Sequence, residues 1–239
     1  MIPLLDPAEA FPPVEEALDE PNGLLAAGGS LAVPRLIDAY ARGIFPRFSA
    51  GDPGLWWSPD PRMVLEADDL RVSRSLRKRL RRRDYEVTAD RAFGAVIRAC
   101  AAPRAGEDGT WLVPSMIDAY ERMHAAGLAH SVEVWMEGAL VGGLYGVALG
   151  RMFFGESMFT RRTDGSKIAF VHLVEQLRRW GGPLVDCQLR TAHLASLGAR
   201  EIPRREFVRR VGALVRETPF PAPWRFDADL AASFDAPTR

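Results

Sequence analysis

Cysteine is scarce in this chain of 239 residues, which contains two, Cys100 and Cys187. They are far apart and form no Cys-x-x-Cys pair, so the sequence predicts neither a zinc site nor a dithiol redox motif. We therefore expect no metal. The net charge is zero, with 31 basic and 31 acidic residues. That balance excludes a protein that is basic over its whole surface.

Long hydrophobic runs are also missing, since no stretch reaches the 18 apolar residues typical of a membrane-spanning helix. The N-terminus, MIPLLDPAEAFPPVEEAL, has acids and prolines where a signal peptide needs a basic start and an apolar run. We expect a soluble cytoplasmic protein with no membrane partner. A hydrophobic fraction of 47%, with 12 Phe and 6 Trp, is enough for a packed core.

The charge is unevenly distributed along the chain. Eight Lys or Arg and no acid lie in residues 71–83, RVSRSLRKRLRRR. Ser73 can cap a helix there, and its basic face is Arg74, Arg77, Lys78, Arg81 and Arg82. Such a run is often a solvated helix face. Because like charges on neighbouring turns repel one another, an anionic partner is favoured, with a phosphate backbone as the natural candidate.

The N-terminal part, residues 1–62, is predicted to be a small α/β lobe. Its helix runs from about Val33 to Arg42, with Pro34 in the first turn and Gly43 at the end. An aromatic, proline-rich segment follows from Gly43 to Arg62, and we expect it to lack regular structure. Residues 63–239 form the second predicted domain.

Beyond residue 128 the hydrophobic period changes to two. Three strands, about 130–136, 140–149 and 152–159, are separated by short turns, and a helix at 166–180 leads to a further strand at 184–189. This order of elements resembles the acyl-CoA N-acyltransferase (GNAT) fold. The prediction is an α+β protein: a small N-terminal lobe and a GNAT-like C-terminal domain with a central, mostly antiparallel sheet. By analogy, acyl transfer to an amine is the expected chemistry.

Three polar residues lie on strand-like segments among apolar neighbours. Asp186 and Gln188 are two apart, so they are predicted to share a face of the strand. Gln188 can accept a hydrogen bond from an attacking amine, and Asp186 can polarise the amide. Glu156 can hold a cationic substrate group. The alternatives are a surface glutamate at a strand end, and an aspartate that caps a turn or pairs with an arginine.

Loop aromatics form another group. Trp56, Trp57, Trp111 and Tyr40 lie near glycines and prolines. Most tryptophans belong to a core, but a tryptophan beside a phosphate-binding helix can stack on a base.

The ordered motifs of the chain resemble one family. They are PNGLLAAGGSL, YARGIFP, WWSPDPR, GTW, AHSVEVW, LVGGLYGVALG, FFGESMF, DCQ and HLASLGAREIPRREF. Together, from about Pro21 to Phe207, they resemble leucyl/phenylalanyl-tRNA–protein transferases. The resemblance implies an aminoacyltransferase that moves Leu or Phe, and also Met, from aminoacyl-tRNA to the α-amine of proteins that begin with Arg or Lys. This marks them for the N-degron pathway, and no cofactor is implied.

The resemblance also implies roles for individual residues. Catalysis falls to Asp186 and Gln188, with Glu156 holding the acceptor. The implied donor side-chain pocket is Leu144, Phe153 and Val185. The implied contacts with the 3′ adenosine of tRNA are Trp111, Tyr120 and Tyr40. The basic helix would follow the phosphates of the acceptor stem.

One residue departs from the family pattern. Arg47 stands in GIFPR where the family has tryptophan, and it could stack on a base or contact phosphate instead. Family members are expected to be monomers. Two alternatives stay open from the residues: an acyl-CoA-dependent N-acetyltransferase and a non-catalytic RNA-binding module.

Overall fold

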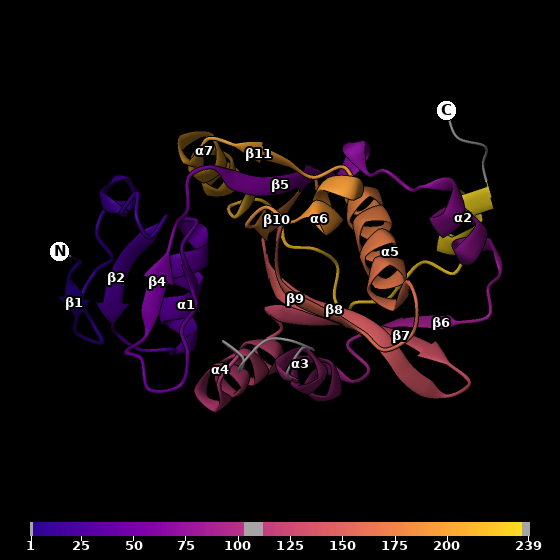
Figure 1. The fold of residues 1–239 in the computed structure, drawn as a ribbon, viewed down its shortest axis with the longest axis horizontal. Coiled ribbons are helices and arrows are strands. Elements are labelled where there is room, and N and C mark those ends of the chain that lie inside the picture. Colours follow the sequence, from indigo (N-terminus) through magenta and orange to yellow (C-terminus); the bar gives the residue numbers. More distant parts are fainter. Residues whose placement is uncertain (1, 103–111, 236–239) are drawn as a thin grey trace.

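The computed structural model describes residues 2–102 and 112–235, which form two β-sheets with helices around them (Figure 1). The smaller sheet belongs to the N-terminal lobe and has the strand order β1-β2-β4-β3. Its strands are β1 (Leu4–Leu5), β2 (Leu24–Gly28), β3 (Phe45–Pro46) and β4 (Leu55–Trp57). The lobe also contains the short helix η1 (Val14–Glu16) and helix α1 (Val33–Ala41), which has the predicted proline in its first turn.

The expectation of an irregular segment from Gly43 to Arg62 was wrong. Strands β3 and β4 pair antiparallel there, with Phe45 opposite Trp57, and β4 pairs with β2 on its other edge. The tryptophans explain this order. Trp56 is buried and its Nε1 donates to the carbonyl of Gly28, while Trp57 Nε1 donates to the carbonyl of Arg47. The pairing of β2, β4 and β3 therefore shields these aromatic side chains from water and supplies partners for their N–H groups.

The larger sheet has seven strands in the order β11-β5-β10-β9-β8-β7-β6. Every neighbouring pair is antiparallel except β9 and β10, which confirms the predicted α+β fold with a mostly antiparallel sheet. The strands are β5 (Arg62–Glu66), β6 (Glu86–Ala89), β7 (Ala129–Met136), β8 (Ala139–Leu149), β9 (Met152–Thr160), β10 (Leu184–Gln188) and β11 (Arg200–Ile202).

Helices cover both faces of this sheet: α5 lies on one face, and α3 and α4 lie on the other (Figure 1). The basic helix α2 lies at the end of the sheet away from the N-terminal lobe and packs against η3. The elements are η2 (Ala67–Asp69), α2 (Arg74–Arg81), α3 (Phe93–Ala101), α4 (Pro114–Ala125), α5 (Gly165–Arg179), α6 (Ala192–Ser196), α7 (Arg204–Leu214) and η3 (Leu230–Asp235).

Strands β9 and β10 pair over a short length and then part. The register runs from Leu184 opposite Met152 to Asp186 opposite Phe154. Strand β9 continues to Thr160, whereas β10 ends at Gln188. Backbone groups beyond the last pair are therefore free of sheet hydrogen bonds between these two strands, and a pocket opens where they separate.

The two lobes share one apolar core. Tyr40 of α1 is buried against Phe154 of β9, with ring centroids 5.1 Å apart, and Phe45 of β3 belongs to the same cluster. The division at residues 62 and 63 stays a prediction, because Arg62 begins β5 and still contacts the N-terminal lobe. Within residues 2–102 and 112–235, no helix is both long and apolar enough to cross a bilayer.

The backbone of β8 lies in close contact with the start of α5, and adding one methyl group at this contact tests how much it contributes to stability. A Cβ at Gly142 would lie 2.5 Å from the carbonyl carbon of Gly165. We expect Gly142→Ala to lower the free energy of unfolding by about 1–3 kcal/mol, because the helix cannot move without disturbing the sheet. Urea unfolding measures this.

Gly212 in α7 is the matched control, because a Cβ there meets nothing within 4 Å. Gly212→Ala should raise stability by up to about 1 kcal/mol through helix propensity. Equal effects of the two substitutions would show that α5 does not depend on close approach at Gly142.

Candidate active site

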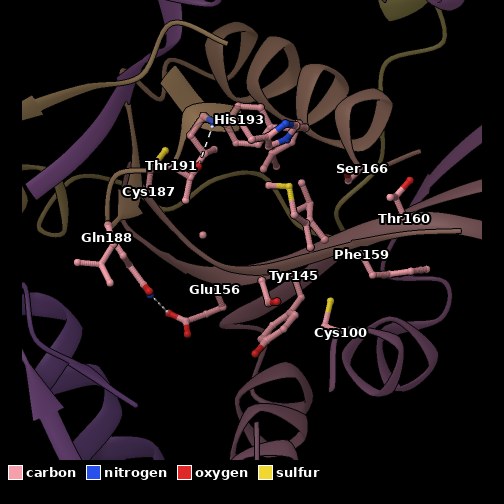
Figure 2. Close-up of a pocket in the computed structure, with 18 of the residues that line it drawn as sticks. Cys100, Tyr145, Glu156, Phe159, Thr160, Ser166, Cys187, Gln188, Thr191 and His193 are labelled. Carbon is pink, nitrogen blue, oxygen red and sulfur yellow. Dashed lines mark hydrogen bonds between the residues drawn. The ribbon is translucent and has the colours of Figure 1, made fainter. Parts of the chain in front are cut away.

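The pocket between the parted strands has a volume of about 920 Å³. Residues 155–160 of β9 and the following Arg161 line one side of it, and residues 186–191, at and beyond the end of β10, line the other. Figure 2 shows Gln188 and Glu156 pointing toward one another on one side of the pocket, with Ser166 and His193 on the other side. The size suits a ligand larger than a free amino acid.

Asp186 is held by an arginine that the sequence did not single out. The guanidinium of Arg62 donates from Nε to Oδ1 at 2.8 Å and from Nη2 to Oδ2 at 2.6 Å. Both side chains are at most 1% exposed. Arg62 also lies between the rings of Phe45 and Phe207, at 4.7 and 4.5 Å from their centroids. Because this buried cation makes two hydrogen bonds to Asp186 and is itself held between two aromatic rings, it fixes the position of Asp186.

The strand geometry at Gln188 differs from the predicted alternation. A register shift falls between Asp186 and Gln188, which lie opposite Val64 and Met63. Gln188 has φ +59°, in the left-handed region, and its N–H donates to Asp186 Oδ1 at 2.9 Å. Asp186 thus contacts Gln188 through the backbone N–H of that residue. A non-glycine residue held in this region is strained, a condition that concentrates at functional sites.

Glu156 is the centre of a buried network of hydrogen bonds. Tyr40 Oη lies 2.7 Å from Oε1, Tyr120 Oη lies 2.8 Å from Oε2, and the two hydroxyls are 2.7 Å apart. Gln188 Nε2 donates to Oε1 at 2.9 Å. Burial raises the pKa of Glu156 to about 7, against the lowering effect of the two tyrosine hydroxyls. The reading of Glu156 as a surface glutamate was wrong, since 8% of it is exposed.

Two of the three predicted donor-pocket residues line the pocket. Leu144 and Phe153 lie in its wall, and Val185 is buried in the neighbouring core cluster. The pocket wall also contains apolar residues that were not predicted from the sequence: Met158, Phe159, Phe170, Leu173 and Leu194. The spacing of Phe170 and Leu173 on one face of α5 was a signal that could have found two of them.

Tyr40 and Tyr120 do not line the pocket. Both are at most 1% exposed and support Glu156 from behind, so neither ring offers a face to a base in this structure. Trp111, the third predicted adenosine contact, lies outside the described residues. Contact of these three residues with adenosine stays a prediction.

The basic helix forms as predicted, with Ser73 accepting from the N–H of Leu76. Arg74, Lys78 and Arg82 are exposed, and Arg77 is half-buried. Arg81 donates to the carbonyls of Phe234 and Asp235, so part of the helix holds the C-terminal segment. The remaining exposed cations are available to an anion, and phosphate binding by this face stays a prediction.

Arg47 and Cys187 both line the pocket. The Arg47 backbone is fixed by pairing with Leu55 and by Trp57, so its side chain starts from a rigid position. Burial and the neighbouring Asp186 raise the pKa of the Cys187 thiol far above its usual range, which makes it a poor nucleophile. Among the described residues, no group of three or more His, Cys, Asp or Glu side chains could hold a metal ion.

Comparison with known families identifies the chain as an aminoacyltransferase. Residues 64–212 match the family model described as leucyl/phenylalanyl-tRNA protein transferase, and residues 29–60 match the model for the N-terminal domain of the same family. The chain belongs to the leucyl/phenylalanyl-tRNA–protein transferase family.

Relatives of the same name cover nearly the whole chain. The protein from Nitrosospira multiformis is 62% identical over 227 residues, which are 95% of this chain and 98% of the relative. The protein from Chromobacterium violaceum is 61% identical over 208 residues, covering 87% of this chain and 89% of the relative.

Solved structures show more distant likeness. A GCN5-related N-acetyltransferase from Kribbella flavida shares 16% identity at a TM-score of 0.36, over 68% of this chain and 57% of that one. The structure of L-PGS from Bacillus licheniformis shares 13% identity at a TM-score of 0.39, over 67% and 52%. Likenesses at this level say nothing of activity.

The Arg62–Asp186 pair is expected to be a large stability determinant. Arg62→Met leaves the carboxylate of Asp186 buried without its cation, which costs about 3–5 kcal/mol in the free energy of unfolding. Urea unfolding measures the loss. The exposed pair of Arg42 and Asp38 provides the control, because Arg42→Met should cost less than about 1 kcal/mol. Similar losses in the two variants would contradict the role given to Arg62.

Proposed function

We propose that this protein transfers Leu or Phe, and also Met, from aminoacyl-tRNA to the α-amino group of proteins that begin with Arg or Lys. The product is a peptide bond that marks the acceptor for the N-degron pathway. Family membership supports transfer from tRNA over acyl-CoA-dependent acetylation and over simple RNA binding. The observation that carries the mechanism is the orientation of Gln188 by Glu156.

The amide of Gln188 orients the attacking amine. Because Nε2 faces Glu156, Oε1 is the end that faces away and accepts a hydrogen bond from the amine. Asp186, fixed by Arg62, holds the Gln188 backbone in its left-handed conformation. An amide is not a base, so its contribution is the position of the nitrogen lone pair relative to the ester carbonyl.

The reaction exchanges one bond at the ester carbon. The amine nitrogen forms a C–N bond to the carbonyl carbon, and the C–O bond to the ribose breaks. The proton lost by the amine is the one that the ribose oxygen gains. Leu144, Phe153 and the apolar residues of α5 provide the wall against which the donor side chain packs. Arg47, at the same pocket, contacts the aminoacyl-adenosine end in place of the family tryptophan.

The exposed cations of α2 bind the acceptor-stem phosphates in this proposal. Figure 1 places α2 at the far end of the large sheet from the N-terminal lobe. A tRNA acceptor stem that entered the pocket would therefore extend along the α5 side of the sheet to reach α2.

The transfer assay tests the function and the role of Gln188. Labelled Leu-tRNA and a protein that begins with Arg should give a labelled acceptor, and ribonuclease should abolish the label. Gln188→Ala should lower kcat/KM by roughly 10²-fold or more, because the amine loses its oriented acceptor. Gln176→Ala, at a buried glutamine that accepts from the N–H of Asp227 and does not line the pocket, is the matched control. Full activity of a folded Gln188→Ala variant would refute this role.

Charge reversal tests the basic face. The triple variant Arg74→Glu, Lys78→Glu and Arg82→Glu should raise KM for aminoacyl-tRNA at least tenfold at low salt and flatten its salt dependence, because each phosphate contact releases counterions. The same reversal at the exposed residues Arg205, Arg209 and Arg216 around α7 is the control. Equal rises in KM from the two triple variants would mean that the α2 face attracts tRNA only nonspecifically.

A further inference from the structure

Three oxygen-bearing groups form a closed triangle behind the pocket. Tyr40 Oη and Tyr120 Oη are 2.7 Å apart, Tyr40 Oη is 2.7 Å from Glu156 Oε1, and Tyr120 Oη is 2.8 Å from Glu156 Oε2. All three distances are those of O–H···O hydrogen bonds. The three side chains come from α1, α4 and β9 and are buried.

Counting protons settles the state of the triangle. Each short oxygen–oxygen contact needs one hydrogen between the two atoms, so three are required, and two tyrosine hydroxyls supply two. With an ionised carboxylate, two hydroxyl oxygens that both donate to Glu156 would face each other at 2.7 Å without a hydrogen. We infer that Glu156 carries a proton in the free protein and that Tyr40, Tyr120 and Glu156 form a cyclic ring of hydrogen bonds.

The amide of Gln188 fixes the direction of the ring. Gln188 Nε2 donates to Glu156 Oε1, which makes this oxygen the acceptor of two hydrogen bonds when Tyr40 also donates to it. A carbonyl-type oxygen has two lone pairs and accepts both. The proton therefore sits on Oε2 and points to Tyr120, Tyr120 donates to Tyr40, and Tyr40 donates back to Oε1.

The charges that face Glu156 agree with a neutral acid. From β10, Asp186 raises its pKa, and from β5, Arg62 lowers it less than burial raises it. Arg62 already holds Asp186 in two hydrogen bonds. From α1, α4 and β8, Tyr40, Tyr120 and Tyr145 have pKa values raised by burial, so they stay protonated. Cys100 of α3 also lies near Tyr145, and a thiol supplies no cation.

The ring makes Tyr40 and Tyr120 positioning residues. They act through Glu156, whose carbonyl-like oxygen receives Gln188 Nε2 and so directs the other end of that amide toward the pocket. Tyr40 belongs to the N-terminal lobe, which means that this lobe completes the catalytic site. The proton assignment stands independently of the proposed function, whereas its effect on transfer rests on that function.

Carbon-13 NMR of glutamate carboxyls tests the proton directly. In the full-length protein, one carboxyl signal should titrate with a midpoint near pH 7, and that signal should be missing from Glu156→Gln. An unperturbed glutamate titrates near pH 4.5. A Glu156 signal that titrates below about pH 5 would overturn the inference, because the carboxylate would then be ionised throughout the neutral range.

Stability as a function of pH gives an independent test. The folded-state pKa lies above the ordinary value of 4.5, so the stability that Glu156 contributes is fully present below about pH 4.5 and is lost as pH rises to about 7. Relative to Glu156→Gln, whose amide also donates to Tyr120 and accepts from Tyr40 and Gln188, the wild-type folding constant should fall about tenfold per pH unit in that range. A rise with pH would overturn the proposal.

Glu133→Gln provides the matched buried control. Its carboxylate accepts from the hydroxyls of Thr88 and Ser131 and from two backbone N–H groups. The NH2 group of a glutamine at this position would therefore face hydrogen-bond donors instead of acceptors. We expect Glu133→Gln to be clearly destabilised at pH 5, where Glu156→Gln is close to wild type. Equal losses in the two variants at this pH would contradict a protonated Glu156.

Tyr120→Phe separates positioning from ligand contact. Removing the hydroxyl breaks the ring, so kcat for transfer should fall at least tenfold while KM for aminoacyl-tRNA stays unchanged. A raised KM with unchanged kcat would mean that Tyr120 contacts the adenosine instead and would overturn its positioning role. If wild-type protein gives no transfer while the NMR midpoint is near pH 7, the proposed function fails and the proton ring stands.

Discussion

A buried ion pair between Arg62 and Asp186 is the interaction on which the rest of the site depends. Its cation lies between Phe45 of the N-terminal lobe and Phe207 of α7, and it also donates to the carbonyl of Gly43. Its anion holds the backbone of Gln188. Desolvation makes such a pair costly unless every hydrogen bond is made, so the surrounding elements have little freedom to move apart. One contact thus fixes both the lobe arrangement and the pocket edge.

The separation of β9 and β10 opens the pocket next to the elements that the Arg62–Asp186 pair holds together. Sheet hydrogen bonds between β9 and β10 end at Asp186 and Phe154, and the next residues of each strand line the pocket. Polar groups lie at the point of parting, and apolar residues of β8, β9 and α5 form the wall beyond it. A site with one polar end and one apolar wall suits an amine that must attack an ester carrying an apolar side chain, as in the proposed transfer.

Hydrophobic periodicity was sufficient to predict most of the second domain. The alternating runs at 130–159, the helix predicted near 166–180 and the strand predicted at 184–189 all form, the last ending at Gln188, because local period decides which face is buried. The prediction for the segment from Gly43 to Arg62 was wrong for a related reason. Strands β3 and β4 are two and three residues long, too short for a period to show, and pairing between distant segments creates them.

The sequence by itself determined the family, the α+β class and the presence of Glu156, Asp186 and Gln188 on strands. Tertiary structure decided what each of them bonds to. Asp186 meets Arg62, 124 residues away, and Glu156 meets Tyr40, 116 residues away. Local pattern carries no information on such pairs, because burial, charge compensation and proton sharing act between groups that only the complete fold brings together.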